Sequence, residues 1–428
     1  MKLSTPAAVA GPPTAPGVSL TSAVSGPRPW LRVLGCGIAA LITLAPVAAT
    51  AQTDPATPTL TIGPLEFRPK LTLSNIGVDN NVFNSATDPK RDFTLTASPD
   101  LEVSMHPGRL FASYAARTDF NYFRTYKSER SVDRSIVART EVDLGLLKPF
   151  VSLTSGHTSS RASSEIDVRA RHHPRLYVGG TRIKLATRTA IVLSAYRAIE
   201  TYDEGLNFRG VDLATSFDSR TTGYESALSL DLTPFTTFTL TAAREQQRFD
   251  HTPIRDSDSF RIAPSLTFSP LGLITGNASV GYRRLNGLDP TLPDYGGLVA
   301  TGGVGMVIAG RYNVSTTFTR DVRYSYEESL PYYLLNAVRG TLAVQFVGPL
   351  DLRVTGGREG LSYRALTDGP KFGDDRQILY GGGAGYRLAD RLRVVVEALA
   401  IRRTSERDAA REYQNNRIVA TLNWGAIN

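Results

Sequence analysis

The residues best suited to chemistry in this sequence are few and scattered. Of the five histidines only His172 and His173 are adjacent, and without an evident third ligand we interpret them as surface histidines rather than zinc ligands. Asp374 and Asp375 could bind a divalent cation, but a solvated glycine-rich loop explains them more simply. The sequence contains no G-x-S-x-G, P-loop or H-E-x-x-H motif. We therefore expect neither an enzyme nor a bound metal or cofactor.

Charged residues recur instead at alternate positions, with apolar residues between them. A period of two places the two sets on opposite faces of a β-strand. If the apolar set faces lipid, the charged set lines an internal lumen, and we expect there Arg117, Asp119, Arg139, Glu141, Arg261, Arg323, Arg339, Arg353, Arg393, Glu397 and Arg403. Two interpretations stay open: a hydrated, salt-bridged wall that only stabilises the protein, or a polar pathway whose arginines favour anionic or hydroxyl-rich solutes.

The strands that carry this pattern are long. From Phe93 to Met105 every second residue is apolar and the others are polar. At about 3.3 Å per residue, such a segment crosses a membrane at the tilt of a barrel strand. We predict strands at 64–78, 91–105, 109–123, 132–145, 148–158, 173–185, 189–203, 219–233, 236–249, 257–269, 272–287, 295–309, 311–325, 331–347, 350–364, 375–388, 391–405 and 412–425.

These segments predict an all-β protein, a transmembrane antiparallel β-barrel of about eighteen strands, with sixteen possible because alternation is weak from 148 to 217. Short connections alternate with long ones, which predicts short periplasmic turns, long external loops and both termini in the periplasm. The alternative is a soluble exported β-sandwich or β-helix, whose strands are usually shorter. We also expect two aromatic girdles, with Tyr122, Tyr126, Tyr202, Tyr324, Tyr326, Tyr332 and Tyr413 beside long loops and Phe150, Phe235, Phe268, Tyr312, Phe346, Tyr386 and Trp424 beside short turns.

The N-terminus has the three parts of a secretory signal peptide. Arg28 and Arg32 precede an apolar run from 33 to 45, and the A-x-A sequence at 49–51 predicts cleavage after Ala51. A retained signal anchor is the alternative. We therefore divide the chain into a signal peptide at 1–51, a periplasmic linker at 52–63 and an outer-membrane barrel at 64–428. The net charge of +8 does not indicate a nucleic-acid partner, because an exported chain leaves the cytoplasm and its arginines are dispersed among acids.

One segment resembles a known family. Residues 77–84 read G-V-D-N-N-V-F-N, and Asp92-Phe93 and then Ser98-Pro99 follow. This order resembles the opening of a family of outer-membrane β-barrel porins, in which a D-x-N-hydrophobic-aromatic segment precedes a D-F strand carrying S-P. The resemblance implies a barrel in the bacterial outer membrane. It also implies an association with exopolysaccharide export systems, and it provides no catalytic residues.

Three functions fit these observations. No expected connection is as long as the loop that narrows a general porin, so we expect a conduit gated by other components, most simply one that exports an exopolysaccharide with periplasmic export proteins as partners. A general diffusion porin for small solutes is the alternative, and a structural or adhesive barrel is the second alternative. A catalytic site at the barrel rim would require Ser, His and Asp brought together there. Expected partners in every case are outer-membrane lipid and the barrel assembly machinery, although four residues follow the last aromatic, Trp424.

Overall fold

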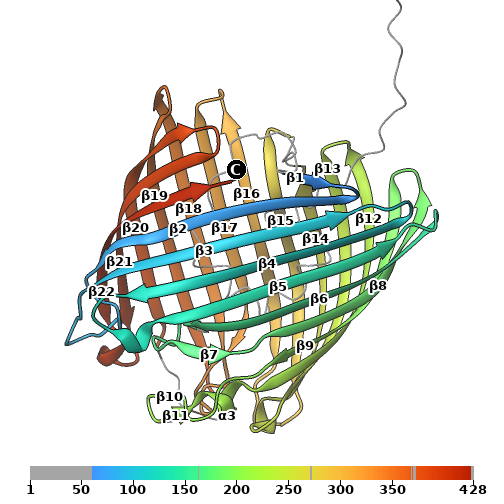
Figure 1. Cartoon of the computed structure of the whole chain (residues 1–428). Helices are drawn as coiled ribbons and strands as arrows, with labels where there is room; N and C mark the ends of the chain where they lie inside the picture. Colours follow the sequence, from blue (N-terminus) through green and yellow to red (C-terminus); the bar gives the residue numbers. More distant parts are fainter. Residues whose placement is uncertain (1–59, 162, 270–271, 368, 370–372, 426–428) are drawn as a thin grey trace, which may run out of the picture.

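The computed structural model describes residues 60–425, apart from 162, 270–271, 368 and 370–372. Within these residues, eighteen long antiparallel strands form a closed barrel, in which β2 pairs with β22 (Figure 1). The barrel strands are β2 (Leu65–Asp79), β3 (Asp92–Met105), β4 (Leu110–Phe123), β5 (Ser131–Val142), β6 (Leu147–Ser160), β8 (Arg175–Ala186), β9 (Thr189–Glu200), β12 (Ser219–Thr233), β13 (Thr236–Phe249), β14 (Ser257–Phe268), β15 (Ile274–Gly287), β16 (Tyr295–Ile308), β17 (Tyr312–Tyr324), β18 (Tyr332–Val347), β19 (Leu350–Arg364), β20 (Asp375–Ala389), β21 (Leu392–Ser405) and β22 (Tyr413–Trp424).

Every predicted strand is present, and its ends fall within three residues of the predicted ones. The count of eighteen is confirmed over sixteen. Alternation is weak in β6, β8 and β9 because their inner faces are apolar too, where Phe150, Val178 and Val192 belong to one buried cluster. Apolar residues on both faces of a strand remove the period of two that identifies it in a sequence.

The two ends of the barrel differ in their connections. Turns of a few residues join the strands at one end, the upper end in Figure 1, which we name the turn end. Gly348, with φ 53°, begins the two-residue turn between β18 and β19, where glycine adopts the left-handed backbone without steric cost. β2 begins and β22 ends at the turn end, since Leu65 lies opposite Met105 and Trp424 opposite Leu392. That this end faces the periplasm stays a prediction.

Longer connections at the other end, the loop end, contain the remaining elements. These are β7 (Ala170–His172), β10 (Asn207–Phe208), β11 (Val211–Asp212), α3 (Leu213–Phe217) and the 3-10 turns Lys127–Glu129, Pro253–Arg255 and Ala409–Arg411. The predicted signal peptide at 1–51 lies outside the described residues. Residues 60–62 of the predicted linker form β1 (Leu60–Ile62), a short strand paired with β2. No helix among the described residues is long and apolar enough to cross a membrane.

Burial alternates along the barrel strands as the two-face interpretation requires. In β3 the polar residues Thr94, Ser98 and Glu102 are buried, whereas Phe93 and Leu101 are exposed on the outer face. The aromatic girdle at the turn end is present in part: Phe235, Tyr312, Phe346, Tyr386 and Trp424 are exposed.

The expected girdle at the loop end is largely wrong. Tyr326, Tyr332 and Tyr413 are buried, and Phe150, expected at the turn end, lies in the inner cluster. Their position at the strand ends was correct, but loop packing and the inner face cover their rings, which alternation alone does not reveal.

Candidate functional site: the capped lumen

A short segment folds into the lumen at the loop end. Residues 161–169 connect β6 to β7, and both Glu165 and Ile166 in this segment are fully buried. The contacts of this segment reach the connection between β17 and β18, and strand β21, which lie far around the barrel from β6. The lumen is therefore obstructed by a connection shorter than the loop that narrows a general porin. A short segment suffices because side chains from other loops and strands hold it across the opening.

Two arginines bind the backbone of this segment. Arg403 of β21 donates from Nη1 to the Ser164 carbonyl at 2.7 Å, and Arg411 donates from Nη2 to the Glu165 carbonyl at 3.1 Å. Both guanidinium groups also bind the Asp375 carboxylate, at 2.6 Å and 2.9 Å. One buried carboxylate thus positions two cations and offsets part of their charge, and charge-assisted bonds of this kind are among the strongest in proteins.

The connection between β17 and β18 meets the same segment from another side. Ser325 donates from Oγ to Glu165 Oε1 at 2.6 Å, and the Tyr326 backbone N–H donates to Oε2. The Tyr326 ring packs with Ile166 and with Phe208 and Leu213 of the 201–218 connection. We name residues 161, 163–169, 201–218, 325–331 and 406–412 together the cap. Figure 1 shows β10, β11 and α3 of the cap at the lower end of the barrel.

Burial in the cap shifts the pKa values of its ionisable groups. The pKa of Glu165 is raised, mainly by burial, although the hydrogen bond from Ser325 and the charge of Arg411 oppose the shift. The pKa of His172 is lowered to about 4, mainly by burial and in smaller part by the neighbouring His173 and His157. His172 is 4% exposed and stacks on Tyr202 with ring centroids 5.1 Å apart. The interpretation of His172 as a surface histidine is therefore wrong.

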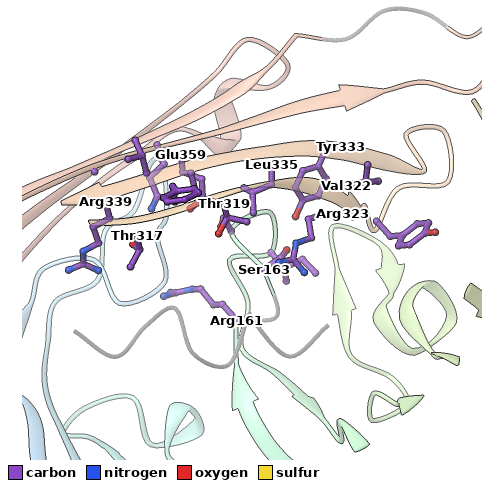
Figure 2. Close-up of a pocket in the computed structure, with 18 of the residues that line it drawn as sticks. Arg161, Ser163, Thr317, Thr319, Val322, Arg323, Tyr333, Leu335, Arg339 and Glu359 are labelled. Atoms are coloured by element: carbon purple, nitrogen blue, oxygen red, sulfur yellow. The ribbon is translucent and has the colours of Figure 1, made fainter. Parts of the chain in front are cut away.

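Beside the cap segment the lumen contains a cavity of about 520 Å³. Ser163, Ile166 and Asp167 contribute to its lining from the segment, and most of the rest comes from β9 and β12–β22. Figure 2 shows Arg161 and Ser163 facing the wall strand that carries Thr319. The lining combines hydroxyl, amide and guanidinium groups with a few aromatic rings such as Tyr196 and Phe249. It also contains carboxylates, fewer than the guanidinium groups, from Asp167, Glu200, Glu245, Glu359 and Glu397. Such a surface hydrogen-bonds small polar solutes and leaves space for water.

The predicted lumen residues fall into three groups. Arg323, Arg339, Arg353 and Glu397 line the cavity. Arg403 holds the cap segment. The other six form ion pairs on the barrel wall: Arg117 with Asp119, Arg139 with Glu141, Arg261 with Glu245, and Arg393 with Asp351.

Sequence analysis missed several residues of this site. Arg161, Glu165 and Arg411 belong to connections, where no periodicity distinguishes a buried polar residue from a solvated one. Asp375 was interpreted as part of a solvated loop, but it is 1% exposed and begins β20. Alternation could have identified Glu245 and Arg283, which lie on the inner faces of predicted strands and pair at 3.0 Å.

Comparison with known structures finds outer-membrane barrels. OpdK of Pseudomonas aeruginosa matches with a TM-score of 0.48 and 10% identity, over 84% of this chain and 99% of that one. OccAB3 of Acinetobacter baumannii gives 0.47 and 10% over the same shares, and a BenF-like porin of Pseudomonas fluorescens gives 0.46 and 12%, over 84% and 98%. No curated protein sequence matches this chain.

A family model described as "Putative beta-barrel porin 2" matches residues 59–424, which include all eighteen barrel strands. The match covers most of the chain and agrees with the family that the D-x-N and S-P segments resemble. Porins are channel proteins rather than enzymes. The chain therefore belongs to this β-barrel porin family and is a porin-like transport protein of the bacterial outer membrane.

Proposed function

We propose that this barrel is a diffusion channel for small hydrophilic solutes with a preference for anions. The observation that carries the proposal is the cavity of about 520 Å³ beside an inward-folded segment of the same chain. A channel narrowed by its own chain needs no other component to restrict its solutes. The main reason for expecting a conduit gated by partners is thereby removed.

The preference for anions follows from the guanidinium groups beside the cavity. Arg161 lies on the segment, and Arg323 and Arg339 lie on the wall at β17 and β18. Within the described residues, Arg339 forms no hydrogen bond and no ion pair within 4 Å. The Glu397 carboxylate attracts it but is itself paired with Arg353 at 3.6 Å, so part of the Arg339 charge is available to a solute. Fixed positive charges in a confined polar passage raise the local concentration of anions.

Exopolysaccharide export, which the sequence resemblance implied, is not supported by the family description, since that description refers to a porin. A polymer chain also requires a continuous wide opening. The segment that follows β6 lies across the lumen instead, and hydrogen bonds hold it to several other elements. Periplasmic export proteins as partners therefore follow from the resemblance alone.

Single-channel recording of the purified protein in a planar bilayer tests the proposal. We expect a steady conductance without added partners, and a reversal potential in a KCl gradient that indicates chloride preference. The variant Arg339→Gln should lower the chloride-to-potassium permeability ratio on the order of twofold, because it removes one fixed charge from the passage.

Arg402→Gln is the matched control, since Arg402 is exposed on the outer face of β21 and does not line the cavity. Its selectivity should equal that of the unaltered protein. A purified protein that conducts only after periplasmic proteins are added would overturn the proposal and favour the gated conduit.

A further inference from the structure

The outer face of the barrel is charged near one end only. Near the turn end the outward-facing strand residues are apolar or uncharged, for example Leu228, Leu240 and Leu266. Near the loop end exposed arginines replace them on successive parts of the wall. We name five of these the arginine belt: Arg197, Arg220, Arg244, Arg284 and Arg320. The same placement recurs on β5, β8, β20 and β21, at Arg134, Arg175, Arg376 and Arg402.

Strand register aligns part of the belt with aromatic rings. Tyr224 lies opposite Arg244, Arg244 opposite Phe260, and Phe260 opposite Arg284, which gives one row across β12–β15. Tyr224 is 59% exposed, Phe260 is 50% exposed, and the Arg244 side chain is 67% exposed. Because neighbouring strands are about 4.8 Å apart, Arg244 and Arg284 lie about 10 Å apart along the row.

Acids near this row offset part of its charge, but they do not reach Arg284. Asp258 is paired with Arg248 at 2.7 Å, and it lies 3.7 Å from Arg244. Arg248 lies directly opposite Arg220 in the β12–β13 register, so two cations are neighbours there. Asp250, 3.1 Å from Arg220, and Asp258 compensate these two cations, which would otherwise destabilise the sheet. Within the described residues Arg284 forms no ion pair, so its charge is left for an external anion.

The restriction of the belt to one end identifies the kind of membrane surface that it contacts. Aromatic residues occur on the outer face near both ends, as interfacial anchoring requires. If arginines only extended toward interfacial water, they would serve equally well at either interface. Their confinement to the loop end indicates that the leaflet there has more anionic headgroups than the leaflet at the turn end. Phosphate is the anion that guanidinium groups bind in bidentate geometry.

We propose that the arginine belt binds the phosphate groups of phosphorylated glycolipids in the outer leaflet of the outer membrane. Arg244 and Arg284 hold phosphates, while Tyr224 and Phe260 contact the acyl chains and sugar ring below them. This assignment places the loop end, with its cap, on the external side of the membrane.

Binding of bisphosphorylated lipid A to the purified full-length protein in a neutral detergent tests this proposal, with native mass spectrometry as the readout. The triple variant R220Q/R244Q/R284Q should bind lipid A more weakly. One basic residue near an anionic headgroup is worth about fivefold in affinity, so three predict a loss on the order of a hundredfold. The single variant Arg244→Lys retains the charge but loses the bidentate geometry, so its loss should be smaller.

The matched control removes the same charge from the turn end, in R109Q/R188Q/R391Q, whose arginines are exposed in short turns. This control should bind lipid A as the unaltered protein does. Dephosphorylated lipid A should bind the unaltered protein as weakly as lipid A binds the triple variant. Equal binding of lipid A by the triple variant, or equal binding of phosphatidylglycerol by the unaltered protein, would overturn the proposal.

Discussion

The turn end and the loop end of the barrel differ in how far along the chain their contacts extend. At the turn end Arg68 binds Glu102, which lies directly opposite it on the next strand. At the loop end Arg403 and Arg411 bind carbonyls 239 and 246 positions earlier in the chain. At the turn end the stabilising contacts join neighbouring paired strands, which every closed barrel has. At the loop end they join connections that are distant in the sequence, and these contacts are particular to this chain. The cap can therefore be loosened while the wall stays intact.

The largest effect on this contrast is expected from Arg411→Ala. Arg411 is fully buried and binds Asp375, Tyr363, Tyr326 and the Glu165 carbonyl. Its removal leaves the Glu165 carbonyl and two tyrosine hydroxyls without this donor and leaves Asp375 with Arg403 alone, at a cost of about 3–5 kcal/mol in the stability of the cap. Single-channel conductance should rise, and amide hydrogen exchange at 163–169 should accelerate.

The control for this variant is Arg391→Ala, in an exposed turn between β20 and β21. Both proteins should retain the heat-modifiable migration of a folded barrel on gels. Unchanged conductance and exchange in Arg411→Ala would mean that the arginine contacts do not hold the cap in place.

A smaller effect is expected from Ile166→Ala. Ile166 is fully buried against Leu213, Phe208 and Tyr326, and removal of its side chain leaves a cavity that costs about 2–4 kcal/mol. Hydrogen exchange should accelerate in both 163–169 and 206–217, because the two connections share this contact. Ile262→Ala, on the outer face of β14, should leave exchange in the cap unchanged. Acceleration confined to 163–169 would show that the two connections pack independently.

Acid should weaken the cap through His172. The folded pKa of about 4 lies below the ordinary value of 6.5, so the opened cap binds the proton more tightly. Above pH 6.5 neutral His172 makes its full contribution to the free energy of opening the cap. As the pH falls toward 4 this contribution is lost, by at most about 3 kcal/mol. Protection factors at 163–173, which divide out the intrinsic pH dependence of amide exchange, should fall over this range. His172→Phe keeps the stacking on Tyr202 without titrating, and an equal acid response in that variant would assign the effect to another group.

The same contrast explains what the sequence could predict. A two-residue period is a local signal, so strands such as β3 and their buried partners Glu102 and Ser98 follow from it directly. The wall residues Arg117, Arg139 and Arg353 were placed by the same signal. Glu165, Tyr326 and Arg411 meet only when the closed barrel brings three connections together, and nothing in their local sequence indicates burial. The inner apolar cluster around Phe150 obscured the period even in the wall.

The smallest effect is expected at the turn end, from Lys148→Ala. Lys148 pairs with Asp143, but their side chains are 35% and 46% exposed, so solvent screens the attraction and the loss should be below about 1 kcal/mol. The hydrogen bond from Lys148 lowers the pKa of Asp143. The Lys148–Asp143 pair therefore contributes to folding stability above the ordinary carboxyl pKa, and this stability is lost as the pH falls below it. In 1 M salt, where the screening length is about 3 Å, the difference from the unaltered protein should vanish in urea unfolding from detergent. Conductance should stay unchanged throughout. If Lys148→Ala cost as much as Arg411→Ala, long-range contact would not be what distinguishes the two ends.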